Sequence, residues 1–339
     1  MSSMFGTYRY ILALMVVIHH LWPGSSPSYI GAYGVYGFYM LSGYLMTLVL
    51  NDVYGFSLTG SKKFLINRAL RIYPSYLVAM LFSLGIIAIT QNILKLQPIT
   101  IKLQSMTTGE WLSNIFIIGL KDQPLPVVPP AWSLNVEIFF YVTMALFLVR
   151  NRNMIVLWFL ISLGYTIYMI ANGVSFSERY FPIEAASLSF SIGSLIYHLR
   201  NYFKNISKWV SLIALIIFIL NASTARYLWK DVRLQGFYIS IFLSSIILIS
   251  LINIKNEETP YWLIKTDRFL GDLSYPIFLL HWHVGTLVSW LIFSADILRG
   301  YNIFIISFLY TNILAYCINQ FIEKKVNKLR DSVRQTKMH

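Results

Sequence analysis

The first apolar segment of the chain carries ionisable residues near both of its ends. It runs from Tyr8 to Trp22, YRYILALMVVIHHLW, and contains Arg9, His19 and His20. In a helix, Arg9 and His20 differ by about 20° in direction and by roughly 16 Å in height, whereas His19 lies about 80° from Arg9 on the other side. An imidazole can take a proton from a hydroxyl near neutral pH or carry an acyl group. The alternative is that Arg9 is a positive anchor and His20 an interfacial residue.

Arg68 and Arg71 form a second candidate group. They lie three residues apart, on one helical face just before an apolar segment that begins at Pro74, a residue suited to the first turn of a helix. Guanidinium groups suit phosphate oxygens because they can bind them through bidentate hydrogen bonds. The alternative is a topology signal, although Lys62 and Lys63 already serve that purpose.

Glu137 follows Trp132 and Ser133 into another apolar segment, about a turn and a half from its start. A carboxylate is costly there unless it has a partner. It could orient a histidine, bind sugar hydroxyls or pair with an arginine, and the sequence leaves these uses open. Trp132 could stack on a sugar ring, but tryptophan is also ordinary at a membrane interface.

The composition places the chain among polytopic membrane proteins. Hydrophobic residues make up 57% of the 339 residues, charged residues make up 12%, and the mean hydropathy is +0.61. Soluble domains are usually about 45–50% apolar. The net charge of +13 does not indicate nucleic-acid binding, because the basic residues form short clusters between apolar segments.

We predict an all-α polytopic membrane protein, a bundle of about ten transmembrane helices, because ten segments approach the ~20 residues that cross a bilayer. The segments are Tyr8–Trp22, Ala32–Leu50, Pro74–Gln91, Trp132–Val149, Met154–Ala171, Pro182–Leu199, Trp209–Ala222, Gly236–Ile254, Leu273–Phe293 and Ile303–Phe321. The first segment lacks the small-residue cleavage site of a signal peptide, so it is expected to remain as a helix.

The lysines and arginines predict that both termini are cytoplasmic. With ten spans, the inner side receives 19 of the 27 basic residues and the outer side receives the other eight. Those eight are Lys95, Lys102, Lys121, Arg179, Arg226, Lys230, Arg233 and Arg299. The partition requires an even number of spans, and it assigns every basic residue to a loop or a terminus.

Short connections between the segments predict a single transmembrane domain over residues 1–339 with no appended soluble domain. The longest connection, Asn92–Ala131, contains Gly109–Leu120, which is a candidate interfacial helix. Cys317 has no partner cysteine in its own chain and lies in an apolar segment, where packing is a commoner role than acyl transfer.

Five motifs follow one another along the chain. They are RYILALMVVIHH from Arg9, GVYGFYMLSGYLMT from Gly34, NRALRIYPSYL from Asn67, AWSLNVEIFFY from Ala131 and LGDLSYPIFLLHW from Leu270. Any one of them alone is a weak signal. In this order, over nearly the whole chain, they resemble the acyltransferase-3 family of bacterial integral-membrane O-acyltransferases of the polysaccharide O-acetyltransferase type.

The resemblance implies transfer of an acyl group, most often acetyl from cytoplasmic acetyl-CoA, to a hydroxyl of an envelope glycan or lipid-linked sugar. O-antigen, capsule and exopolysaccharide are acceptors of this class, and the location implied is the bacterial inner membrane. The family's arginine-to-histidine spacing selects His20 over His19, and its Arg-x-x-Arg pair is associated with the acyl-CoA donor. The candidate residues are therefore His20 and Glu137 for catalysis, and Arg9, Arg68 and Arg71 for the donor.

Other residues of the same motifs are candidates for lining or supporting a cavity: Tyr36, Ser42, Gly43, Trp132, Ser133, Tyr275 and His281. Small residues such as Gly43 allow close helix packing or a narrow cleft, and the sequence does not distinguish these uses. His281 is expected near mid-membrane as a buried hydrogen-bonding residue. His283 is turned from it by about 200°, so the two cannot easily chelate one metal, and no metal is expected.

Two other function classes share the hydropathy. A transporter or flippase for a lipid-linked sugar would also contain buried charges, but it is expected to show inverted repeats with paired broken helices, and the sequence displays neither. A non-catalytic scaffold would leave Glu137 and the shared face of Arg9 and His20 without a role.

Overall fold

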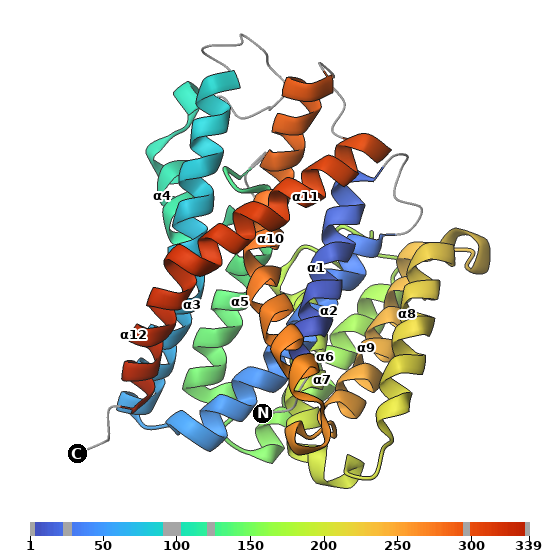
Figure 1. The fold of residues 1–339 in the computed structure, drawn as a ribbon. Coiled ribbons are helices and arrows are strands. Elements are labelled where there is room, and N and C mark those ends of the chain that lie inside the picture. Colours follow the sequence, from blue (N-terminus) through green and yellow to red (C-terminus); the bar gives the residue numbers. More distant parts are fainter. Residues whose placement is uncertain (1–3, 23–28, 91–102, 121–125, 294–298, 336–339) are drawn as a thin grey trace.

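A computed structural model describes residues 4–22, 29–90, 103–120, 126–293 and 299–335 (Figure 1). These residues form helices, turns and loops, with no β-strand among them. The α-helices are α1 (Phe5–Leu21), α2 (Ile30–Val49), α3 (Leu58–Ala88), α4 (Thr108–Phe116), α5 (Trp132–Thr143), α6 (Arg152–Ala171), α7 (Ile183–Leu199), α8 (Lys208–Leu228), α9 (Phe237–Leu251), α10 (Tyr261–Phe293), α11 (Tyr301–Ile318) and α12 (Lys324–Gln335). Short π-helical turns extend α2, α5 and α11 at Leu50–Tyr54, Met144–Leu148 and Asn319–Glu323.

The prediction of an all-α, multi-pass membrane protein is confirmed. In the described part of the chain, eight helical segments are long and apolar enough to cross a membrane. The two remaining predicted spans correspond to α1 and α7, which are only 17 residues long; of the two, α1 is apolar by composition. The count of ten spans and the side on which the termini lie stay predictions.

Two helices extend well beyond the apolar segments that hydropathy identifies. α3 begins at Leu58, where the Ser57 hydroxyl accepts a hydrogen bond of 3.0 Å from the Gly60 amide. Pro74 therefore lies inside α3, and the prediction that it occupies a first helical turn is wrong. The reason is that a capped, polar stretch of helix precedes the apolar part. α10 likewise begins at Tyr261 and contains Pro276 in its interior.

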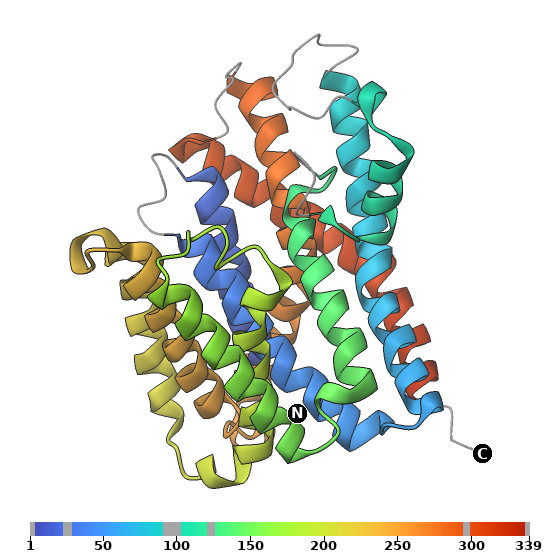
Figure 2. The same cartoon turned by 180° about the vertical axis from the view of Figure 1, so that it is seen from behind.

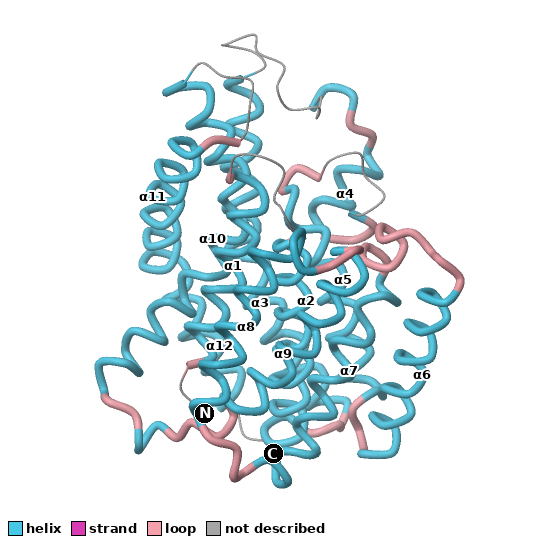
Figure 3. Tube along the Cα trace, turned by 90° about the vertical axis from the view of Figure 1, so that its right-hand side faces the viewer, coloured by secondary structure: helices cyan, strands magenta, loops and turns pink. Residues whose placement is uncertain are grey.

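The helices form one bundle whose two ends differ. α1 begins and α12 ends at the same end, the lower one in Figure 1, and α4 lies toward the opposite end (Figures 1 and 3). α4 confirms the helix predicted within Gly109–Leu120, while residues 91–102 and 121–125 of that connection lie outside the described part. Seen from behind, α5 lies between α3 and the pair formed by α6 and α7 (Figure 2).

Glycines allow the backbones of the central helices to approach closely. A Cβ atom on Gly43 of α2 would meet the backbone carbonyl of Phe190 in α7, and one on Gly193 of α7 would meet the Met40 carbonyl. At the crossing of α1 and α10, a Cβ on Gly6 would meet the Asp267 carbonyl, and one on Gly271 would meet the backbone of Gly6. Small residues of this kind let helices pack tightly in a membrane, so packing explains Gly43.

Replacing Gly43 with alanine is expected to destabilise the protein by about 1–3 kcal/mol, because the added methyl group must displace backbone rather than a movable side chain. The matched control is Gly164→Ala in α6, where a Cβ would meet nothing within 4 Å. Alanine should there be neutral or slightly stabilising. Thermal melting of both variants in detergent tests this, and equal melting temperatures would contradict the role assigned to Gly43.

Candidate functional site

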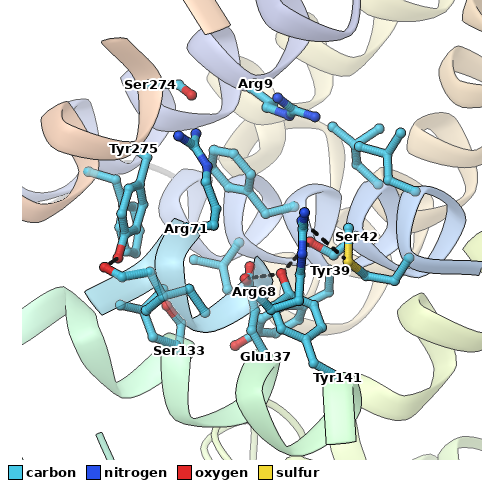
Figure 4. Close-up of a pocket in the computed structure, with 18 of the residues that line it drawn as sticks. Arg9, Tyr39, Ser42, Arg68, Arg71, Ser133, Glu137, Tyr141, Ser274 and Tyr275 are labelled. Carbon is cyan, nitrogen blue, oxygen red and sulfur yellow. Dashed lines mark hydrogen bonds between the residues drawn. The ribbon is translucent and has the colours of Figure 1, made fainter. Parts of the chain in front are cut away.

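Residues from six helices enclose a cavity of about 250 Å³ (Figure 4). The lining residues come from α1, α2, α3, α5, α10 and α12, so the two ends of the chain meet around it. Of the residues singled out in the sequence, seven line this cavity: Arg9, Ser42, Arg68, Arg71, Ser133, Glu137 and Tyr275. Further polar residues also line it, among them Tyr141, Asp272, Asn327 and Arg330, which the sequence did not single out.

Glu137 is held by a tyrosine of its own helical segment. The Tyr141 hydroxyl donates a hydrogen bond of 2.5 Å to Glu137 Oε2, and it lies 3.5 Å from the Ser42 hydroxyl of α2. Among the described residues, no basic side chain lies within 4.0 Å of Glu137, and its hydrogen bond is not to His20. The spacing of four residues between Glu137 and Tyr141 was a signal for this pair in the sequence.

Arg71 is paired with a carboxylate from the distant end of the chain. Its Nη1 lies 2.8 Å from Glu323 Oε2, and the Ser75 hydroxyl donates a hydrogen bond to the other oxygen of Glu323. The Arg71 guanidinium also lies over the ring of Tyr275, 5.5 Å from its centroid. Arg71 therefore contributes to the cavity from a fixed position, with its charge already balanced.

Arg9 and Arg68 differ from Arg71, because no carboxylate in the described part of the chain lies within 4.0 Å of either guanidinium. Arg68 donates to Asn67 Oδ1 at 2.7 Å and to Met46 Sδ at 3.6 Å, and its buried Nε has no hydrogen-bond partner. Two arginines whose charges lack a neighbouring acid make this cavity suited to an anionic ligand.

The predicted catalytic histidine lies outside this cavity, against a second histidine. His20 Nδ1 lies 2.8 Å from His281 Nε2, and the two rings are nearly parallel, with an interplanar angle of 13°. His281 Nδ1 lies 3.1 Å from the carbonyl oxygen of Ile277 one turn earlier in α10. The Trp282 ring packs against His20 edge to face, 4.9 Å away between centroids.

These contacts determine where the protons of a neutral histidine pair lie. A carbonyl oxygen can only accept, so His281 Nδ1 must carry a proton and donate it to Ile277. His281 Nε2 is then an acceptor, and His20 Nδ1 must donate to it. His20 Nε2 is left unprotonated, which is the state that a general base requires.

Phe278 joins the two parts of the site. Its side chain lines the cavity, and its ring centroid lies 6.4 Å from that of His281. The Phe38 ring, which also lines the cavity, lies 6.2 Å from that of Phe278. The histidine pair is therefore one aromatic side chain away from the arginine-lined space.

The remaining candidates lie elsewhere. The Tyr36 hydroxyl donates to the carbonyl oxygens of Arg179 and Tyr180, at 3.3 and 3.0 Å, so Tyr36 anchors that segment. Trp132 packs edge to face on Tyr180 and Phe181. Neither residue lines the cavity. His281 does not line it either, and its side chain is hydrogen-bonded to His20 instead.

Comparison with known proteins agrees with the motifs. A family model described as an acyltransferase domain matches residues 7–319. Among curated proteins, two named O-acetyltransferase OatA, from Staphylococcus aureus strains NCTC 8325 / PS 47 and COL, are each 24% identical to this chain over 345 residues. Those matches cover 94% of this chain and 56% of each relative, so the chain spans about half the length of the curated relatives it matches. No solved structure matches it.

The family match extends over nearly all of the spanning helices and includes all five motifs, from Arg9 to Trp282. The chain therefore belongs to the acyltransferase-3 family.

Proposed function

We propose that this protein transfers an acetyl group from acetyl-CoA to a hydroxyl of an envelope glycan, such as O-antigen, capsule or exopolysaccharide, or of a lipid-linked sugar, at the bacterial inner membrane. Family membership and the names of the O-acetyltransferase relatives support acyl transfer as the reaction. The observation that carries the proposal is that α1 contributes one residue to each of the two parts of the site. This helix places Arg9 in the anion-suited cavity and His20, with an unprotonated Nε2, in the histidine pair.

In the reaction, the acceptor oxygen attacks the thioester carbonyl while His20 Nε2 takes the hydroxyl proton. The carbon–sulfur bond then breaks, and the imidazolium returns the proton to the departing CoA thiolate, so that ester and free CoA are the products. In this proposal the acyl end of the donor passes the Phe278 ring to reach His20, because that ring lines the cavity and lies 6.4 Å from the ring of His281. Arg9 and Arg68 hold the anionic part of the donor. Glu137 and Tyr141, which are hydrogen-bonded to each other, together form a polar part of the cavity wall.

The test uses the full-length protein in proteoliposomes, with acetyl-CoA labelled in the acetyl group and a glycan acceptor. We expect label to enter the glycan as an alkali-labile ester, with release of one CoA per ester. A lipid-linked sugar flippase would move its substrate without consuming acetyl-CoA. Folded protein that releases no CoA and forms no ester with any envelope glycan of its own cell would contradict the proposal.

A further inference from the structure

A second, larger cavity adjoins the first toward the end of the bundle where α1 begins. Its volume is about 730 Å³, and Arg9, Arg68 and Arg330 line both cavities, so these arginines lie between the two spaces. Arg268 and Arg334 line the larger cavity as well. This part of the site is therefore wide and rich in arginine, whereas the narrower part leads to Phe278.

The carboxylates around this larger cavity do not balance the arginines, because its lining contains five arginines and three aspartates, Asp267, Asp272 and Asp331. The Asp267 carboxylate is already used to cap α1, because it accepts hydrogen bonds from the Gly6 and Thr7 amides at the start of that helix, at 3.2 and 2.6 Å. In the described residues, no acidic side chain lies within 4.0 Å of Arg68 or Arg330. A cavity with this excess of positive charge attracts an anion.

A buried amide holds two of these arginines together. Asn67, only 3% exposed, accepts from Arg68 Nη2 at 2.7 Å and from Arg330 Nε at 3.3 Å through the same oxygen. Its amide nitrogen donates to the Arg330 carbonyl at 3.0 Å. Arg330 is also fixed by Asn327, one turn earlier in α12, at 2.6 Å. A neutral side chain thus orients two like charges without neutralising either of them, and Arg68 Nε stays buried without a partner.

We propose that Arg330 and Arg68, oriented by Asn67, bind a phosphate monoester of the acyl donor, the 3′-phosphate on the nucleotide of CoA. This rests on the proposed function, which supplies CoA as the donor. A phosphate monoester carries two negative charges, which suits two guanidinium groups that are both held by the Asn67 side chain. The thioester must extend toward the narrow part near Phe278, so the nucleotide occupies the wide part. α12 lies beyond residues 7–319, so the family match does not cover Arg330.

The experiment compares acetyl-CoA with acetyl-3′-dephospho-CoA as donors for the full-length protein in proteoliposomes. We expect the unmodified protein to favour acetyl-CoA in kcat/KM by about 10- to 100-fold, the size of one charge-assisted contact. Arg330→Gln should lose most of this preference through a higher KM for acetyl-CoA, with kcat little changed. Lys328→Gln removes the same charge from an exposed position of α12 outside both cavities, and it should keep the preference.

Arg330→Lys serves as a second variant, because it retains a positive charge if Arg330→Gln folds poorly. It should keep part of the preference. If the unmodified protein uses both donors equally well, or if Arg330→Lys and Arg330→Gln both discriminate as strongly as the unmodified protein, the phosphate site is wrong. If the unmodified protein uses neither donor, the proposed function fails instead.

Discussion

Replacing His20 with alanine is expected to lower kcat for ester formation by about 10²- to 10⁴-fold, the usual contribution of a general base. The KM for acetyl-CoA should change little, because His20 lies outside the arginine-lined cavity. Initial rates of ester formation in proteoliposomes, normalised to folded protein, measure both parameters. His19→Ala is the matched control, since it removes the neighbouring imidazole and should leave most of the activity.

The histidine pair predicts a specific pattern of coupling. His281→Phe removes the acceptor that fixes the proton on His20 Nδ1, so it should lower kcat as well, by less than His20→Ala does. His281 is a positioning residue, and its loss should have no further effect once His20 is gone. The double variant should therefore be no slower than His20→Ala alone. Rates that fall multiplicatively in the double variant, or normal activity of His20→Ala, would contradict the role proposed for the pair.

Eight of the predicted spans correspond to long apolar helical segments in the described part of the chain, and they were predictable because the bilayer imposes a length and a polarity on each of them. The ends of the helices were less so. Hydropathy records only the apolar part of α3, whereas Ser57 starts the helix at Leu58 and the polar stretch that follows continues directly into the apolar one. The apolar part of α3 was therefore identified correctly, and its beginning was not.

The candidate site was predictable where its spacing is local. Arg68 and Arg71 lie on one helical face by their separation alone, and the structure places both at one cavity. The contacts of His20 with His281 and of Arg71 with Glu323 join residues 261 and 252 positions apart, and no local pattern encodes such pairs. Glu323 also directly precedes the basic helix α12, and in such a charged stretch the sequence does not indicate that one acid is buried.

Glu323 supports the second large prediction. Its side chain is 3% exposed and balances Arg71, whose side chain is 21% exposed. Glu323→Gln preserves the shape of the side chain but leaves the arginine without its counter-charge. Breaking a buried pair by removing one partner typically costs about 3–5 kcal/mol. We therefore expect a much lower melting temperature in detergent and less protein in the membrane.

The control for this variant is Glu258→Gln, which breaks the exposed pair between Lys255 and Glu258, with side chains 70% and 61% exposed. Exposed pairs contribute about 0–1 kcal/mol, so its melting temperature should be almost unchanged. The double variant Arg71→Met/Glu323→Gln removes the unbalanced charge and should regain much of the stability that Glu323→Gln loses. If the double variant is instead less stable than Glu323→Gln, the cost comes from lost packing and hydrogen bonds around Ser75 rather than from an uncompensated arginine.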